Sequence, residues 1–221
     1  MKRQIILFCL FVFAIFVNAQ TFEPTTKWPY LYKDFQSGTI FLSKGTKTTM
    51  TVNVHLLKSS LQYLKDELIY QADSKDVIRV EIGADQFIYI DGELAKILEK
   101  NGKNYLLSIT KGDFDALTSG TGAYGTSAQS SATTDLSSME IGGLSNMNHK
   151  QLVFEKEDGK ILPLKTEYYF VIDGKPVLAS KKEIIDFVDV QKKAQLNTFL
   201  KENRIKWKNK ESLSKLLLFF K

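Results

Sequence analysis

Few residues of this 221-residue chain have the types and spacing that chemistry at a protein site requires. The two histidines, His55 and His149, are far apart and show neither the H-x-H nor the H-x-x-x-H spacing of a local metal site. Serines are plentiful, but no G-x-S-x-G motif selects one of them as a nucleophile. The sequence therefore predicts no metal ligands and leaves any catalytic residues unknown.

Residues 120–125 match the G-x-G-x-x-G pattern that contacts the pyrophosphate of a dinucleotide. That function needs a strand directly before the pattern and a helix directly after it. Here both flanks belong to a stretch, residues 118–138, that consists almost entirely of Ser, Thr, Gly and Ala. We therefore expect no dinucleotide and no other cofactor.

The best candidates for binding are aromatic residues that follow the first twenty-odd residues of the chain: Trp28, Tyr30, Tyr32 and Phe35. Exposed aromatic rings can stack on sugars or clamp peptides, and an exposed aromatic patch often marks a contact site. The alternative is that these rings plug one end of a β core.

The chain begins with the three-part pattern of a secretory signal peptide. Lys2 and Arg3 precede an apolar run over residues 5–17, and Ala19 supplies the small residue for cleavage, so residues 1–19 form the predicted signal peptide. The 13-residue run is short for a membrane span, which takes roughly 20 residues. Because no small residue precedes Cys9, we interpret it as a hydrophobe of the removed segment and not as a lipid attachment site.

Cleavage would remove the single cysteine, which excludes thiol chemistry and disulfides from the mature chain. It would also lower the formal charge from +5 to +3, because Lys2 and Arg3 are lost. The positive surplus lies in residues 181–221, which hold eleven Lys and Arg against five Asp and Glu. These charges alternate with apolar positions as on a solvated helix face, and exported proteins rarely meet nucleic acid. We therefore expect no nucleic-acid partner.

Between residues 38 and 112, short apolar runs alternate with turn residues. The clearest run, residues 49–56, alternates apolar and polar side chains, which indicates one buried and one solvated face. Asn-Gly and Asp-Gly pairs between runs favour tight hairpin turns. Strands are expected at 39–42, 49–56, 61–64, 68–71, 77–82, 86–90, 95–99 and 105–110. The predicted fold is mainly β, an antiparallel sandwich or a small open barrel.

Residues 118–148 are too poor in apolar side chains to pack, and they predict a flexible insertion in a β-rich domain that spans residues 20–180. Further strands are expected at 151–156, 161–164 and 168–172.

A C-terminal helical segment is predicted over residues 181–221. Ser180 and Glu183 have the spacing of a capping box, and apolar residues at helical spacing continue to about Asn203. A second short helix is expected after Asn209. This helical pair either docks on the β core or contacts a partner or a membrane surface.

The patterns at residues 28–42, 50–57 and 61–63, with a signal peptide that ends Asn18-Ala19-Gln20, resemble a family of uncharacterised exported envelope proteins of the Bacteroidetes. The resemblance covers most of the mature chain and is carried by hairpin patterns. It implies a β-rich domain with C-terminal helices and implies no activity. The β-rich sorting domain that takes some proteins of that group across the outer membrane is not recognised here, which favours the periplasm over the extracellular space.

We therefore expect an exported, non-enzymatic cell-envelope protein that binds another envelope protein or a small ligand. The alternative is a periplasmic or secreted hydrolase whose site is assembled from scattered residues, and a ligand-carrying barrel is a third possibility. A closed pocket lined by His55 and carboxylates would favour the enzyme. A filled core with an exposed aromatic or apolar strip would favour binding.

Overall fold

The computed structural model describes residues 29–66, 68–113 and 162–220. The predicted signal peptide, the predicted insertion at 118–148 and the predicted strand at 151–156 lie outside these residues, as do Trp28 and His149.

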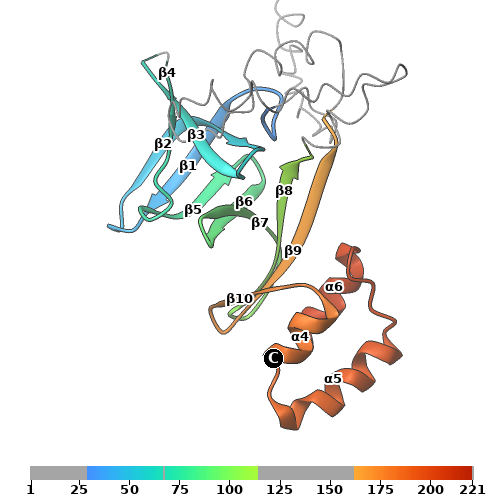
Figure 1. Cartoon of the computed structure of the whole chain (residues 1–221). Coiled ribbons are helices and arrows are strands. Elements are labelled where there is room, and N and C mark those ends of the chain that lie inside the picture. The colour runs from blue at the N-terminus through green and yellow to red at the C-terminus, as the bar shows by residue number, and fades with distance from the viewer. Residues whose placement is uncertain (1–28, 67, 114–161, 221) are drawn as a thin grey trace, which may run out of the picture.

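The described strands form one ten-stranded antiparallel sheet (Figure 1). Their order across the sheet is β10-β9-β8-β7-β6-β5-β1-β2-β3-β4, so β10 and β4 are its two edges. The strands are β1 (Gln36–Leu42), β2 (Lys47–His55), β3 (Ser60–Lys65), β4 (Leu68–Gln71), β5 (Val77–Ile82), β6 (Asp85–Ile90), β7 (Glu93–Asn101), β8 (Asn104–Gly112), β9 (Leu164–Ile172) and β10 (Lys175–Leu178). The predicted mainly β, antiparallel class is confirmed, in the form of an open sheet.

Tight turns join several of these strands as the sequence predicts. The Asp91-Gly92 and Asp173-Gly174 pairs connect β6 to β7 and β9 to β10. All four residues have positive φ angles, between 49° and 82°, which is the backbone of the two-residue turn that matches the twist of a hairpin. The sequence did not predict β10, because its four residues include a proline, Pro176.

The part of the sheet from β1 to β8 curls, because the turn between β2 and β3 reaches across to β7 and β8. The Leu94 N–H donates to the Ser59 carbonyl oxygen at 2.7 Å, and the Ser59 hydroxyl donates to the Leu94 carbonyl oxygen at 2.7 Å. The Gly112 N–H donates to the Leu56 carbonyl oxygen at 3.0 Å. The curl encloses a core of inward-facing side chains that includes Val80 and Phe87.

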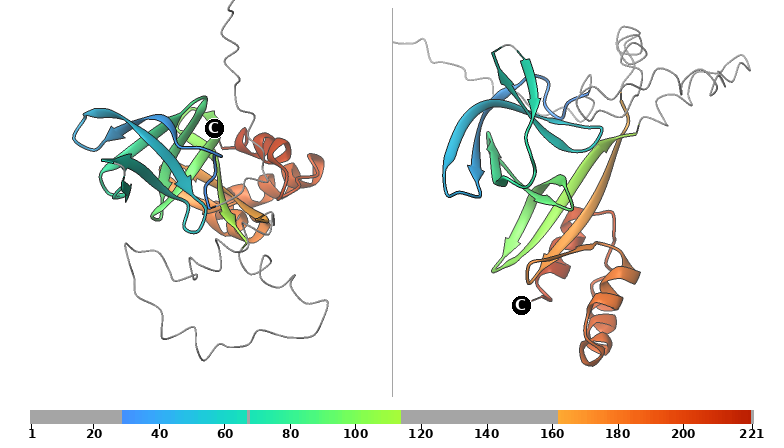
Figure 2. Two further views of the ribbon diagram at one scale, coloured as in Figure 1. Left: turned by 90° about the horizontal axis from the view of Figure 1, so that it is seen from above. Right: turned by 60° about the vertical axis from the view of Figure 1, so that its left-hand side comes forward.

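The hairpin of β8 and β9 extends past the curled part and carries the helices at its far end (Figures 1 and 2). These are α4 (Lys181–Phe187), α5 (Val190–Glu202) and α6 (Lys210–Leu217). A second core joins them to the sheet, because buried side chains of all three helices pack with Leu106 of β8 and Phe170 of β9. Asn104 also donates to the Phe220 carbonyl oxygen, which ties the end of the helical segment to the start of β8.

Both predicted helix starts are confirmed. The Ser180 Oγ accepts a hydrogen bond from the Glu183 N–H at 3.3 Å, and the Asn209 Oδ1 accepts one from the Ser212 N–H at 2.8 Å. The stripe expected to form one helix up to about Asn203 is instead divided between α4 and α5. The backbone of Val188 is extended, with ψ 138°, and its buried side chain packs in the second core. The break lets both α4 and α5 direct apolar side chains into that core.

Candidate functional site

The segment that precedes β1 pairs with the far end of β2. The Leu31 N–H donates to the Val54 carbonyl oxygen at 2.8 Å, and the Leu56 N–H donates to the Pro29 carbonyl oxygen at 2.7 Å. Tyr30 is thereby placed opposite His55 in an antiparallel bridge. We call residues 29–35 the aromatic segment.

Asn53 of β2 holds the aromatic segment in place. Its Oδ1 accepts hydrogen bonds from the N–H groups of Tyr32 and Val54 at 3.1 and 2.8 Å. Its Nδ2 donates to the carbonyl oxygens of Tyr32 and Asp34 at 2.8 and 3.2 Å. Asn53 is 0% exposed and His55 is 7% exposed, so the solvated face predicted for this end of the strand is wrong. The alternation in sequence is real, but the aromatic segment covers its polar side.

Two of the predicted binding residues, Tyr30 and Phe35, are half-buried and touch each other. The two rings meet edge to face with centroids 4.9 Å apart, and the Tyr30 ring meets His55 in the same way at 5.2 Å. The Tyr30 hydroxyl donates to the Gln62 Oε1 at 2.8 Å, and burial raises the pKa of Tyr30. These rings therefore cover buried polar groups of β2 and β3.

Tyr32 points the other way, toward the inside of the curl, and is buried. Its hydroxyl donates to the Asp85 Oδ2 at 2.7 Å, and the Asp85 Oδ1 is 2.7 Å from the Lys96 Nζ. Burial, and next the hydrogen bond to the Asp85 carboxylate, raise the pKa of Tyr32 well above its usual value. A role in binding for Tyr30, Tyr32 and Phe35, and for Trp28, stays a prediction.

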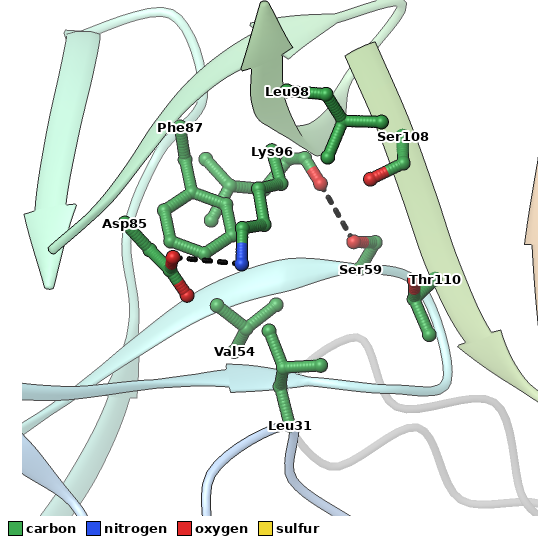
Figure 3. Close-up of a pocket in the computed structure, with 10 residues that line it drawn as sticks. Leu31, Val54, Ser59, Asp85, Phe87, Lys96, Leu98, Ser108 and Thr110 are labelled. Carbon is green, nitrogen blue, oxygen red and sulfur yellow. Dashed lines mark hydrogen bonds and ion pairs between the residues drawn. The ribbon is translucent and has the colours of Figure 1, made fainter. Parts of the chain in front are cut away.

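The ion pair of Asp85 and Lys96 borders a cavity of about 170 Å³ inside the curled part of the sheet (Figure 3). One wall comes from β6, β7 and β8, and the other from the aromatic segment, β2 and the turn after β2. The lining residues are Leu31, Val54, Ser59, Asp85, Phe87, Leu94, Lys96, Leu98, Ser108 and Thr110. Apolar side chains thus form most of the wall, and the charged pair and three hydroxyls are its polar groups.

His55, the histidine among the described residues, does not line this cavity. His55 lies on the opposite face of β2 from Val54, which lines the cavity. Among the described residues, no group of three or more His, Cys, Asp or Glu side chains could hold a metal ion. The pocket of His55 and carboxylates that would favour an enzyme is therefore not formed by the described residues, since Asp85 lines the cavity and His55 does not.

An exposed apolar strip is present at one edge of the sheet, on β4. Its apolar side chains are 59% exposed at Leu68, 51% at Ile69 and 41% at Tyr70. Tyr70 stacks on Tyr63 of β3, with ring centroids 5.6 Å apart and an interplanar angle of 20°. The side chains of Leu68 and Tyr70 project from one face of the sheet and that of Ile69 from the other. We call residues 68–71 the β4 edge.

The backbone of the β4 edge offers hydrogen-bonding groups to a further strand. The Ala72 N–H donates to the Leu61 carbonyl oxygen of β3 at 2.9 Å. Because the direction of backbone groups alternates along an antiparallel strand, Leu68 and Tyr70 also face β3. Ile69 and Gln71 therefore direct their N–H and C=O groups away from the sheet.

The opposite edge, β10, offers fewer free backbone N–H and C=O groups to a further strand. By the same alternation, Pro176 and Leu178 are its outward residues, because the Ala179 N–H donates to the Tyr168 carbonyl oxygen of β9. Pro176 has no N–H to donate. The Leu178 carbonyl oxygen already accepts a hydrogen bond from the Ser180 N–H at 2.8 Å. Proline at an outward position is a recognised way to protect a sheet edge from further pairing, and β4 has no such residue.

The apolar stripe of the C-terminal helices is not a surface. Leu196, Leu213 and Leu216 are fully buried in the second core. The large apolar side chains that are exposed in this segment are Val190 of α5 and Leu218, which directly follows α6. In the part of the chain that the structure describes, no helix is long and apolar enough to cross a membrane. Contact of these helices with a membrane surface stays a prediction.

Comparison of the chain with protein-family models, with curated proteins and with solved structures finds no match. Function is therefore inferred from the geometry of the aromatic segment, the cavity and the β4 edge.

Proposed function

We propose that this protein is an exported, non-enzymatic cell-envelope protein that binds an extended segment of a partner protein by strand addition at the β4 edge. The observation that carries the proposal is the apolar edge strand, on which Leu68, Ile69 and Tyr70 are all more than 40% exposed. Soluble proteins rarely leave such an edge unprotected unless it is used.

Strand addition needs both backbone groups and side-chain contacts, and the β4 edge offers both. The outward N–H and C=O groups of Ile69 and Gln71 give an added strand its hydrogen bonds. Leu68 and Tyr70 on one face, and Ile69 on the other, give apolar contacts to alternate side chains of the partner. We therefore expect the partner to supply an extended segment with apolar side chains on both of its faces.

The rest of the molecule is consistent with binding at this end. The helices pack at the far end of the β8–β9 hairpin, away from β4 (Figures 1 and 2). The position of His55 outside the cavity favours binding over hydrolysis. The predicted signal peptide and the resemblance to Bacteroidetes envelope proteins support the periplasm as the place of binding.

The proposal is tested by photo-crosslinking in cells of the native organism. A photoreactive amino acid at position 69 should crosslink a discrete partner. The same amino acid at position 78 is the matched control, because Ile78 is 57% exposed but lies on β5, an inner strand between β1 and β6 and not an edge of the sheet. Equal crosslinking from both positions, or none from position 69, would contradict strand addition.

Two variants at position 69, tested by affinity pull-down of the partner that crosslinking identifies, separate the side chain from the backbone. Ile69→Lys should abolish this capture, whereas the control Ile78→Lys should leave it unchanged. Ile69→Pro removes an outward N–H and none of the β3–β4 ladder, so it should also abolish capture while the thermal unfolding temperature stays close to that of the parent. Capture that survives Ile69→Pro would rule out backbone pairing at this edge.

A further inference from the structure

The cavity in the curled part of the sheet is a second candidate site, separate from the β4 edge. Its volume is about 170 Å³. An apolar cavity of about 150 Å³ in another protein takes up benzene, so this one has room for about six to eight non-hydrogen atoms. Phe87 and Leu94 are buried lining residues that give it an apolar wall.

The charges at the cavity balance each other. Lys96 lies on the same face of the sheet as Phe87 and Ser108, its partners in register on β6 and β8. Its ammonium pairs with the Asp85 Oδ1 at 2.7 Å, and the Asp85 Oδ2 accepts the Tyr32 hydroxyl at 2.7 Å. Each carboxylate oxygen therefore already holds a donor, whereas the ammonium has three N–H donors and this pairing engages one.

Ser108 adds a second donor inside the cavity. Its side chain is directed into the cavity, whereas the Lys96 ammonium is directed toward Asp85 (Figure 3). Ser108 is only 7% exposed. Its hydroxyl makes no hydrogen bond with another of the described residues. The Ser108 Oγ is not fully buried, so it stays accessible to a molecule in the cavity. The cavity thus presents donors from Lys96 and Ser108 against an apolar wall.

We propose that this cavity binds a small neutral molecule with one acceptor oxygen, which bonds to Lys96 and Ser108, and an apolar body that packs on Phe87 and Leu94. An anion is disfavoured because Asp85 already neutralises Lys96 and would repel it. A cation is disfavoured because the Lys96 ammonium, 2.7 Å from the Asp85 Oδ1, would repel it. A purely apolar molecule would leave the Ser108 hydroxyl without a partner.

The test uses three probes of similar size with the full mature chain: cyclohexanone, methylcyclohexane and hexanoate. Binding is followed by NMR titration of the Phe87 ring and of the Lys96 and Ser108 backbone amides. We expect saturable shifts with cyclohexanone, and at least tenfold weaker binding of methylcyclohexane and of hexanoate. Hexanoate or methylcyclohexane binding as tightly as cyclohexanone would overturn the assignment, as would the absence of saturable shifts with cyclohexanone.

Ser108→Ala is the matched variant, because it removes one hydroxyl and changes the side-chain volume little. It should weaken cyclohexanone binding about tenfold, which corresponds to about 1.4 kcal/mol of binding free energy. The affinity for methylcyclohexane should stay unchanged or rise. Unchanged affinity for cyclohexanone would show that Ser108 is not part of a ligand site. Unshifted amide signals from β1 to β4 would establish that the variant is folded. The two affinity measurements do not depend on whether a partner binds at the β4 edge.

Discussion

Replacement of Asn53 by alanine should release the aromatic segment from the sheet. The Asn53 side chain is 0% exposed and makes four hydrogen bonds to backbone groups of Tyr32, Asp34 and Val54. Asp34 is exposed, so its carbonyl oxygen can turn to water. The other three bonds involve groups of buried residues, and each is worth about 1 kcal/mol net. We therefore expect Asn53→Ala to lower the free energy of unfolding by about 3 kcal/mol.

The assay is equilibrium denaturation in urea, combined with hydrogen exchange of the Tyr32 amide. In the variant that amide loses its acceptor, so its exchange should become faster than that of the amides in β8 and β9. Gln86→Ala is the control, because the Gln86 side chain makes one long hydrogen bond at the surface. Its Nε2 donates to the Glu81 Oε1 at 3.4 Å, and the contact is exposed. We expect the control to change stability by less than about 0.5 kcal/mol. A loss below about 1 kcal/mol for Asn53→Ala, or unchanged exchange of the Tyr32 amide, would refute the role assigned to Asn53.

Three further predictions follow from packing and charge. A Cβ at position 38 would overlap the Val52 Cγ2, so Gly38→Ala should destabilise the sheet by about 1–3 kcal/mol in urea denaturation. Leu213 is 0% exposed in the second core, so Leu213→Ala should cost about 2–5 kcal/mol, measured by calorimetry; a smaller effect would mean that the helices do not pack on β8 and β9 as described. Burial, and next the charge of Glu167, raise the pKa of Tyr169 to about 12, whereas tyrosine in an unfolded chain titrates near 10. The stability that this group contributes is fully present below pH 10 and is lost as the pH rises from about 10 to about 12. Tyr169→Phe should make the alkaline unfolding curve less steep, and an unchanged curve would contradict this assignment.

Local signals in the sequence predict most of the individual elements. The alternation over residues 49–56 and the Asp-Gly turns place β2 and two hairpins correctly, because both signals act between near neighbours in the chain. Ser180 and Asn209 mark the starts of α4 and α6 for the same reason. The sequence could not place the break at Val188, since the burial of that side chain depends on how the helices pack with β8 and β9 in the second core.

The candidate sites depend on contacts between distant residues, which one sequence does not show. The sequence of residues 68–71 predicts an ordinary short strand. Its exposure follows from the strand order, because β1 pairs with β5 and β4 is left at the edge of the sheet. Lys96 lies between two apolar residues, Ala95 and Ile97. The alternation of apolar and polar side chains would therefore place Lys96 on the solvated face of the strand. In the structure β6 to β9 carry buried side chains on both faces, with Ala95 packed on one and Lys96 directed into the cavity on the other.

Burial of the polar side of β2 has the same origin. Nothing within residues 49–56 indicates that Asn53 and His55 will be covered, because the cover comes from Tyr30 and its neighbours some twenty residues earlier. The aromatic residues could be recognised as unusual from the sequence. The sequence does not show which way each ring points. In the folded chain Tyr30 covers polar groups of β2 and β3, whereas Tyr32 points toward Asp85.

Hydrogen exchange of four backbone amides decides whether the β4 edge pairs with a partner strand. In the free protein the amides of Leu68 and Tyr70 should be protected by β3, while those of Ile69 and Gln71 exchange rapidly. With the partner identified by crosslinking, all four should be protected. Exchange at Ile69 and Gln71 that stays rapid in the complex would contradict strand addition at this edge.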